Sequence, residues 1–272
     1  MPDPVTIQET LVELLEAGPK EKSVLIQGGV EESHATIQGV YKALRMLRDK
    51  EVVTIHGSVV SLSFFWIDKG LARFGQIAEA YQTPTRSQYF LQLKPGEKIS
   101  LKFRTLRELD LYWDHAFLLL ETQLPTSLPA YSVVPHDWFY YARPQTDKLW
   151  VKRHEMHGRK QRVVITHPTP IDRELLNARR AKLLEAMFGA NPFHQDERCH
   201  FNIIGDWVFE AKLDGGVNDK LVAWIRKHKK FTEKERSEID DILDSRGKFT
   251  LKIGHAPKRA RQMTDRLEKY FQ

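Results

Sequence analysis

Apolar residues at helical spacing predict three short helices within the first fifty residues. The first is expected over residues 6–17 and the second over residues 21–27, where Gly28 and Gly29 would close it. The third is expected over residues 34–49, with Ser33 as its N-cap. Its apolar stripe, which we expect to face a core, consists of Ile37, Val40, Tyr41, Leu44 and Leu47.

Two runs rich in β-branched residues follow, over residues 52–55 and 59–65. Because His56 and Gly57 lie between them, the two runs predict a hairpin. Apolar residues over 66–82 then recur at spacings of 4, 3, 4 and 3, which is the seam of a coiled coil. We expect a linker helix that pairs with its copy in a homodimer. The residues of this seam are Ile67, Leu71, Phe74, Ala78 and Tyr81.

A Thr-Pro-Thr sequence at 83–85 marks a domain boundary. Beyond it, strand-like and helix-like segments alternate, which is typical of an α/β domain. The expected fold class is therefore α+β, with an N-terminal domain over 1–65, a linker helix over 66–85 and a C-terminal domain over 86–272.

Local patterns also predict individual elements of that C-terminal domain. A capping box formed by Thr105 and Glu108 predicts a helix to about Glu121. Three prolines within 125–135 predict a loop, and Thr169 begins a long helix that we expect to end at Gly189. The expected strands cover residues 89–93, 98–103, 150–156, 161–166, 199–204, 207–213 and 249–253. Further helices are expected over residues 217–230, 232–247 and 257–271.

Composition is that of a globular protein: 41% of the residues are hydrophobic and 29% are charged. No apolar run is long enough to span a membrane, and no signal peptide is evident. A single cysteine, Cys199, excludes an internal disulfide and fits a reducing compartment, so we expect a cytoplasmic protein. The net charge of +6 permits a polyanionic partner, although residues 1–70 carry seven basic and ten acidic side chains.

Three helices followed by a hairpin predict a winged helix-turn-helix. In such a domain the third helix enters the major groove of double-stranded DNA, and the hairpin contacts the neighbouring backbone. The helix must then present outward side chains that donate to base edges or phosphates. The candidate DNA-binding residues are Ser33, His34, Thr36, Gln38, Lys42, Arg45, His56 and Ser58.

The segment HATIQGVYKALRMLRDKEVVTIHGSVVSLS, residues 34–63, resembles winged-helix transcription regulators of the MarR and TrmB type. Members similarly place a Tyr-x-x-Leu-x-x-Leu stripe in the third helix, here Tyr41, Leu44 and Leu47. The helix over 66–82 resembles the dimerising linker of the TrmB-like group. That resemblance implies a C-terminal sensor domain like a catalytically inactive phospholipase D, and residues 215–231 are loosely similar to the end of such domains.

A live phospholipase-D site needs His-x-Lys-x(4)-Asp. The nearest match is His200, Asn202 and Asp206, in which asparagine replaces the lysine and the aspartate comes one place early. We therefore expect no catalytic residue of this kind, no cofactor-binding motif and no metal site. His194, Cys199 and His200 lie close in sequence but lack the paired spacing of a structural zinc site.

A basic stretch and an aromatic cluster in the C-terminal domain suggest a site for an anionic small-molecule effector. Lys152 and Arg153 lie in a predicted hairpin that turns at residues 157–158, and Trp138 to Tyr141 follow a proline-bounded segment. The alternative for both features is ordinary structure: a solvated hairpin and a loop locked onto the core. The candidate effector-binding residues are His136, Arg143, Lys152, Arg153, Arg159 and Lys160.

The sequence thus favours a dimeric DNA-binding transcription regulator with a C-terminal ligand-sensing or dimerisation domain. One alternative is a protein-interaction module of the antitoxin type, supported by the acidic balance of residues 1–70. Another is a nucleic-acid-processing enzyme with its site in 86–272. The carboxylates that would bind metal in that enzyme are Asp137, Asp206, Glu210 and Asp214.

Overall fold

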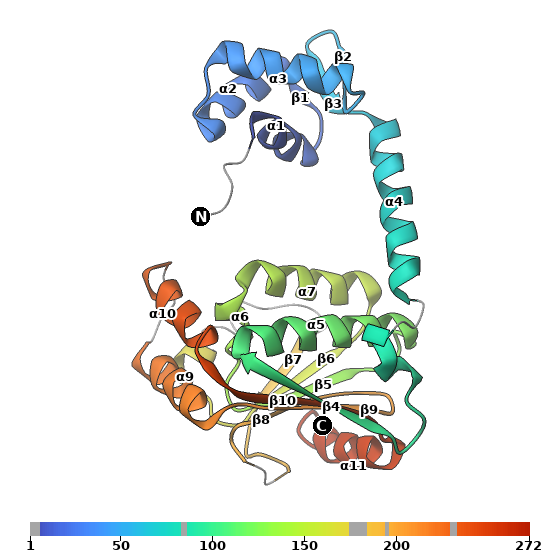
Figure 1. Cartoon of the computed structure of the whole chain (residues 1–272), viewed down its shortest axis with the longest axis vertical. Coiled ribbons are helices and arrows are strands. Elements are labelled where there is room, and N and C mark those ends of the chain that lie inside the picture. Colours follow the sequence, from blue (N-terminus) through green and yellow to red (C-terminus); the bar gives the residue numbers. More distant parts are fainter. Residues whose placement is uncertain (1–5, 83–85, 174–183, 194–195, 229–232) are drawn as a thin grey trace. The chain divides into compact units, whose positions relative to one another are not determined.

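A computed structural model describes residues 6–82, 86–173, 184–193, 196–228 and 233–272. The chain divides into two compact units, Met1–Thr83 and Pro84–Gln272 (Figure 1). Both units combine helices with a β-sheet, so the predicted mixed α and β fold is confirmed at this level. The linker helix falls within the first unit, and the predicted boundary at 83–85 lies outside the described residues.

The first unit has four helices and a small antiparallel sheet of strand order β1-β3-β2 among its described residues. Its helices are α1 (Ile7–Glu16), α2 (Lys22–Ser33), α3 (Ile37–Asp49) and α4 (Phe64–Gln82). Its strands are β1 (Lys20–Glu21), β2 (Val53–His56) and β3 (Val59–Leu62). The predicted hairpin is confirmed as β2 and β3, joined at Gly57, whose φ of 59° suits glycine.

Helix α2 is longer than the sequence suggested. The prediction that Gly28 and Gly29 end it is wrong, because α2 continues through both residues to Ser33. A Cβ at Gly29 would lie 2.9 Å from Leu11 Cδ2 and 3.1 Å from Val40 Cγ1. Glycine here lets α2 approach α1 and α3 closely, and the three helices share a core with the hairpin.

Helix α3 begins three residues later than predicted. Its N-cap is Thr36, whose hydroxyl accepts a hydrogen bond from Gly39 N at 3.1 Å. The prediction that Ser33 caps this helix is wrong, since Ser33 ends α2 and its hydroxyl donates to Gly29 O. His34 adopts the left-handed conformation, with φ of 52°, and terminates α2.

The second unit is built on a seven-stranded mixed sheet of order β4-β10-β9-β8-β5-β6-β7 among its described residues. Its strands are β4 (Lys98–Thr105), β5 (Ala130–Val134), β6 (Gln161–Ile165), β7 (Leu184–Phe188), β8 (Cys199–Ile204), β9 (Trp207–Lys212) and β10 (Arg246–His255). Its helical elements are η1 (Arg86–Gln92), α5 (Leu106–Gln123), α6 (Phe139–Ala142), α7 (Pro144–His157), α9 (Gly215–Lys227), α10 (Glu233–Leu243) and α11 (Pro257–Glu268). Strands β5, β6 and β7 are parallel, and the others pair antiparallel.

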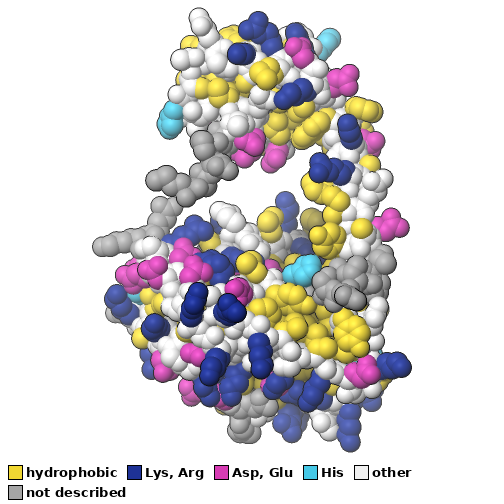
Figure 2. Space-filling model, in the orientation of Figure 1, with side chains coloured by type: hydrophobic (Ala, Val, Ile, Leu, Met, Phe, Trp, Pro, Cys, Tyr) yellow, Lys and Arg dark blue, Asp and Glu magenta, His cyan; other side chains and the backbone are white. Residues whose placement is uncertain are grey.

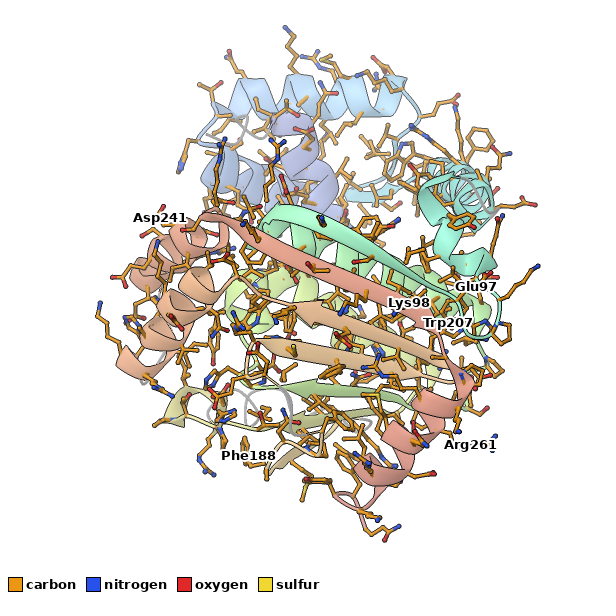
Figure 3. The ribbon with its side chains drawn as sticks, turned by 60° about the horizontal axis from the view of Figure 1, so that its bottom comes forward. Glu97, Lys98, Phe188, Trp207, Asp241 and Arg261 are labelled. Atoms are coloured by element: carbon orange, nitrogen blue, oxygen red, sulfur yellow. The ribbon has the colours of Figure 1, made fainter. Side chains whose placement is uncertain are left out.

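Two helical layers cover this sheet, as Figure 1 shows: α5, α6 and α7 on one face and α11 on the other. Side chains alternate along each strand, so Phe201 and Ile203 of β8 pack on the α11 side. His200 and Asn202 point to the opposite side, where α5 lies. Figure 3 shows the sheet from Lys98, at the start of the edge strand β4, to Phe188, at the end of the other edge strand β7.

Several local predictions for the second unit are confirmed. Thr105 caps α5 and accepts a hydrogen bond from Glu108 N at 3.1 Å. Strands β8 and β9, which were predicted over residues 199–204 and 207–213, pair around Gly205 and Asp206. His200 is buried, because β8 lies between β5 and β9 in the sheet.

Two predicted strands are helical. Residues 89–93 lie mostly in η1, and residues 150–156 lie in α7. The predicted basic hairpin therefore does not exist. Gly158 does not turn a hairpin but ends α7 in the left-handed conformation, with φ of 68°.

Two other segments are strands where none was predicted. The proline-bounded stretch 125–135 contains β5, whose five residues are all buried in the sheet. The long helix expected from Thr169 to Gly189 begins at residue 170, but β7 occupies residues 184–188. Most of the remainder of that predicted helix lies outside the described residues.

Candidate functional site

The outward face of α3 carries the polar side chains on which the DNA-binding prediction depends. Gln38, Lys42 and Arg45 are all exposed. Neither Lys42 nor Arg45 has an ion-pair partner among the described residues, whereas Arg48 contacts Asp49 at 2.8 Å. Two cations on one helical face are thus available to an external anion.

Exposed apolar residues share this face, which corrects the predicted stripe. Ile37 and Tyr41 were expected in the core but are 59% and 41% exposed. Ala43, which is not part of the predicted stripe, is buried. The residues of α3 that pack inward are Val40, Ala43, Leu44 and Leu47.

One further cation near this face was missed by the sequence reasoning. Lys22 Nζ lies 5.6 Å from the centre of the Tyr41 ring, although Lys22 begins α2 and is nineteen residues away in sequence. Only the packing of α2 against α3 brings the two together. The sequence carried no signal of this contact, because Tyr41 was expected to face the core.

The other predicted DNA-binding residues lie at the ends of elements. His34 is exposed at the end of α2, and Thr36 is exposed but engaged in capping α3. His56 and Ser58 are exposed at the tip of the β2-β3 hairpin. The backbone of Ser58 is fixed, because its carbonyl accepts a hydrogen bond from Lys22 N at 2.7 Å.

Helix α4 exposes nearly every apolar residue it carries. Of the predicted seam, Leu71 is 67% exposed, Phe74 69% and Tyr81 56%, and Ala78 is also exposed. Ile67 is half-buried. Hydrophobic side chains are visible along α4 in Figure 2. The predicted seam therefore lies on a continuous helix, and most of its apolar side chains are exposed.

A cavity of about 110 Å³ opens in the second unit between the sheet and helices α5, α6 and α7. Its walls are aromatic and come from three helices. Helices α5 and α7 contribute aromatic side chains to these walls, and α6 contributes the side chain of its first residue. The wall residues are Trp113, Phe117, Phe139 and Trp150.

A row of three polar side chains, from adjacent strands, forms part of the cavity lining on the sheet side. Ser132 Oγ accepts hydrogen bonds from Gln161 Nε2 at 2.9 Å and from Asn202 Nδ2 at 2.6 Å. Gln161 is only 1% exposed, and its Oε1 has no hydrogen-bond partner among the described residues. Gln161 thus lines the cavity while its own buried oxygen lacks a donor among the described residues.

Carboxylates surround Arg143, the one arginine among the described residues that line the cavity. Arg143 Nε donates to Asp110 at 2.6 Å, and its Nη1 donates to Asp114 at 3.2 Å. Asp137 and Asp147 also line the cavity. Burial raises the pKa of Asp110 to about 6, against the opposing effect of Arg143.

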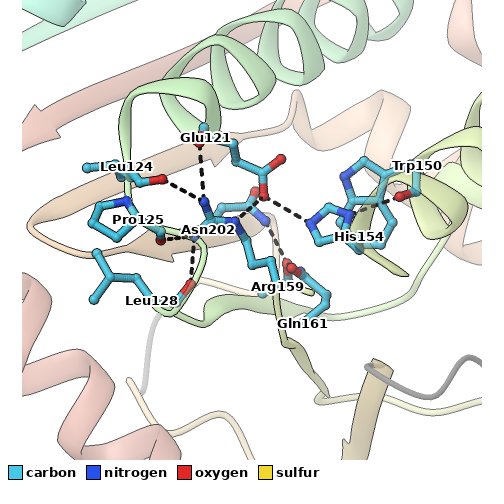
Figure 4. A network of polar contacts seen from close by, with 10 residues as sticks. Glu121, Leu124, Pro125, Leu128, Trp150, His154, Arg159, Gln161 and Asn202 are labelled. Carbon is cyan, nitrogen blue, oxygen red and sulfur yellow. Dashed lines mark hydrogen bonds and ion pairs between the residues drawn. The ribbon is translucent and has the colours of Figure 1, made fainter. Parts of the chain in front are cut away.

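A second buried network fixes the helices around the cavity (Figure 4). Arg159, 3% exposed, donates to four carbonyl oxygens at and beyond the C-terminal end of α5, at 2.6–3.2 Å. Its Nε also lies 3.5 Å from Glu121, which contacts His154 Nε2 of α7 at 2.9 Å. The carbonyls are those of Glu121, Leu124, Pro125 and Leu128. Arg159 therefore satisfies a helix end.

Two histidines near the cavity are also structural. His136 Nδ1 lies 3.3 Å from Asp172, which additionally accepts bonds from Thr169. Burial opposes ionisation of Asp172, but these hydrogen bonds outweigh it and lower the pKa of its carboxyl. Burial lowers the pKa of His200 to about 3, and its Nε2 accepts from Trp138 Nε1 at 3.2 Å. His200 is thus held neutral.

The structure does not bring the predicted effector-binding residues together. Arg143 alone of the six lines the cavity, and it is already paired with two carboxylates. Arg159 and His136 are buried in their own networks, and exposed Lys160 lies 3.5 Å from Glu185. Lys152 and Arg153 lie on α7 rather than on a hairpin. An anion site built from this set is not formed.

The carboxylates proposed for a metal-dependent enzyme are likewise separated. Asp137 lines the cavity, whereas Glu210 pairs with Lys252 and Arg259 on the α11 side of the sheet. Asp214 caps α9. Within the described residues, no group of three or more metal-binding side chains converges, and His194 lies outside them.

Comparison with known proteins does not assign this chain to a family. No protein-family model matches this chain, and no curated protein matches it. Among solved structures it is similar to N,N-8-amino-8-demethyl-D-riboflavin dimethyltransferase (RosA) from Streptomyces davawensis, with 12% identity over 69% of this chain and a TM-score of 0.23. The chain spans 62% of the length of that enzyme. At this TM-score the likeness carries no conclusion about fold or activity.

Membrane insertion through a helix finds no support in the part of the chain that is described. None of its helices combines the length and the apolar character needed to cross a bilayer.

Proposed function

We propose that this chain is a dimeric, sequence-specific DNA-binding transcription regulator of the cytoplasm, with an N-terminal winged helix and a C-terminal ligand-sensing unit. The observation that carries the proposal is the outward face of α3. There, Lys42 and Arg45 are exposed and lack ion-pair partners among the described residues. Cations without ion-pair partners, on a helix that is followed by a hairpin, are suited to bind the phosphate backbone of DNA.

The side chains on this face also suit the reading of base edges. Arginine pairs in bidentate fashion with guanine, and glutamine pairs with adenine, so Arg45 and Gln38 are the candidates for specificity. Lys42 would contribute mainly to affinity and its salt dependence. His56 and Ser58, at the hairpin tip, would contact the adjacent backbone.

The low stability of α4 as an isolated helix supports dimerisation through it. An isolated helix of nineteen residues with Gly70 and Gly75 in its interior is only marginally stable in water. Its heptad-spaced apolar residues, including Leu71 and Phe74, would be buried by the same seam of a second copy. A two-fold dimer would then bind a two-fold symmetric DNA site.

The test is the affinity of the full chain for DNA selected from a genomic library. We expect the double variant Lys42→Ala/Arg45→Ala to bind at least about tenfold more weakly, because it loses two phosphate or base contacts. The matched control is Lys69→Ala/Arg73→Ala, which removes the same charge from exposed positions of α4. Equal affinity of the first variant and wild type, or equal weakening by both variants, would contradict the proposed interface.

A protein-interaction module is the second candidate, and the apolar residues of α3 favour it. Ile37, Tyr41 and Met46 are at least 40% exposed, and such residues are common in protein interfaces. A stable complex with a protein partner that is lost in Ile37→Asp, together with no DNA selected from the library, would favour this candidate over the first.

A further inference from the structure

We propose that one face of the sheet in the second unit binds the phosphate backbone of a nucleic-acid duplex, without regard to its sequence. This face, which we call the basic sheet face, is the side of β4, β10 and β9 that points away from α5. The inference goes beyond the proposed function, because it concerns a different surface and needs neither α3 nor a dimer. The basic sheet face consists of Lys98, Ser100, Lys102, Arg104, Glu210, Lys212, Thr250 and Lys252.

Alternation along the strands separates this face from the hydrophobic core. Ile99, Leu101 and Phe103 of β4 pack into the core beneath α5, so the residues between them point to the other side of the sheet. In β10, Leu251 and Ile253 are buried in the same core, and the lysine between them points the other way. The basic side chains of three adjacent strands therefore lie on one face.

Helix α11 packs on a neighbouring part of this side of the sheet. Its buried residues Ala260, Met263 and Leu267 share a cluster with Phe201 of β8 and Val208 of β9. In Figure 3, α11 lies beside the basic sheet face, and β4 and β10 run across the view without a helix over them. Every lysine and arginine of the face is exposed, and Figure 2 shows such side chains gathered over the lower part of the second unit.

The strands that form the face hold few carboxylates. Together, β4, β9 and β10 carry seven basic side chains and a single acidic one, Glu210. Glu210 is shared by two cations, since it lies 3.0 Å from Lys252 and 2.8 Å from Arg259 of α11. Lys212 lies 3.2 Å from Asp196, in the loop before β8.

The edge strand β4 carries the cations that are available to an external anion. Lys98, Lys102 and Arg104 have no ion-pair partner among the described residues. Residues 71–272 also carry nine more basic than acidic side chains, since the whole chain has 42 and 36 and residues 1–70 have seven and ten. A polyanion would be attracted to this unit and would find unneutralised cations on the basic sheet face.

The spacing of the face suits a chain of phosphates. Lys98 and Lys102 are four residues apart on one strand, which separates their backbones by roughly 14 Å. Thr250 lies in register between Lys102 and Lys212, so the face is roughly 10 Å wide across its three strands. Each strand of duplex DNA presents one phosphate per roughly 3.4 Å of helix axis, so the face spans several phosphates.

The polar character of the face favours a duplex over a membrane or a single strand. None of the exposed large apolar side chains among the described residues lies on β4, β9 or β10. A membrane surface would need such side chains for insertion, and unpaired bases would need exposed aromatic rings for stacking. Ser100 is exposed instead, and its hydroxyl can donate to a phosphate oxygen.

The experiment measures the affinity of the full chain for a short duplex of random sequence, by fluorescence anisotropy over a range of salt concentrations. We expect Lys98→Gln/Lys102→Gln to weaken binding at least about tenfold. The slope of log affinity against log salt should fall by about one for each lysine removed. The duplex is used as DNA and as RNA. A loss with one of them identifies the ligand, and a loss with neither overturns the proposal.

Two further variants separate charge from fold and from position. Lys98→Arg/Lys102→Arg keeps both charges and should bind as wild type does. The matched control Lys148→Gln/Lys152→Gln removes two lysines with the same spacing from exposed positions of α7, and its affinity should be unchanged. Equal weakening by the two glutamine variants would overturn the assignment to the basic sheet face. So would lysine-dependent binding to vesicles of phosphatidylcholine and phosphatidylserine without binding to either duplex.

Failure of this inference is distinguishable from failure of the proposed function. Lys98→Gln/Lys102→Gln should weaken binding to selected and random DNA by the same factor, because phosphate contacts carry no sequence information. Lys42→Ala/Arg45→Ala should reduce the preference for selected over random DNA. A chain that shows no such preference but still requires Lys98 and Lys102 for duplex binding loses the regulator and keeps the basic sheet face.

Discussion

Helices α4 and α5 have almost the same length, nineteen and eighteen residues, yet they stand in opposite environments. Eight residues of α5 are buried, among them Trp113 and Phe117, and its two ends are capped by Thr105 and Arg159. The described side chains of α4 are exposed or half-buried, despite a similar share of apolar residues. The comparison teaches that α5 is stabilised by its own unit, whereas α4 requires something beyond its own residues.

Removal of the arginine at the end of α5 tests the first half of this comparison and should have the largest effect. Arg159→Ala leaves Glu121 buried beside His154 and four carbonyl oxygens without their donor. We expect a loss of about 3–5 kcal/mol in the free energy of unfolding of the second unit. Urea titration followed by tryptophan fluorescence measures it. The neighbouring Lys160→Ala, at an exposed position, should change the stability by less than about 0.5 kcal/mol.

A charge introduced on the seam of α4 tests the second part of the comparison, that α4 requires something beyond its own residues. Leu71→Glu or Phe74→Glu should raise the dissociation constant of the dimer roughly 100-fold, because a carboxylate would be buried against the partner helix. Sedimentation velocity over a range of concentrations measures the constant. Leu149→Glu is the matched control, since Leu149 is 68% exposed on α7 and outside the seam. A wild-type chain that stays monomeric at high concentration would refute dimerisation through α4.

Substitutions at two glycines test the contrast between packed and unpacked helices, and they should have the smallest effects on stability. Gly29→Ala should destabilise the first unit by roughly 1 kcal/mol, because the new methyl group would crowd Leu11 and Val40 by more than its helix propensity gains. Gly70→Ala meets no atom within 4 Å and should stabilise α4 by up to about 1 kcal/mol. Thermal unfolding measures the change in stability of both variants. A change of the same sign in both would contradict the contrast.

The predictable parts of the fold were those with a local signal. The capping box of Thr105 predicted α5, the strand-like runs over 199–204 and 207–213 predicted β8 and β9, and the heptad spacing predicted α4. In contrast, β5 was hidden because prolines flank it, and only pairing with β6 and β8 makes it a strand. Residues 150–156 became helical through distant contacts, such as that of His154 with Glu121.

The candidate sites differ in the same way: one has a local signal in the sequence, and the other does not. Lys42 and Arg45 could be proposed from sequence because they lie on the outer face of one helix. The cavity could not, since Ser132, Gln161 and Asn202 come from three strands that are adjacent only in the sheet. Arg143 lines the cavity, but its pairing with Asp110 and Asp114 could not be predicted, because these two aspartates lie on α5 about thirty residues earlier.

The sheet order also bears on how the chain folds during its synthesis. Strand β10 lies between β4 and β9, so the strand formed from residues 246–255 joins the first strand of the second unit to the rest. Until the ribosome has released those residues, β4 has no neighbour among the described strands, and β9 lacks one of its two neighbours. Helices α1, α2 and α3 and the β2-β3 hairpin need only residues within 6–62 and can fold early. Nascent chains should therefore expose the unfinished sheet to chaperones for most of the time that translation takes.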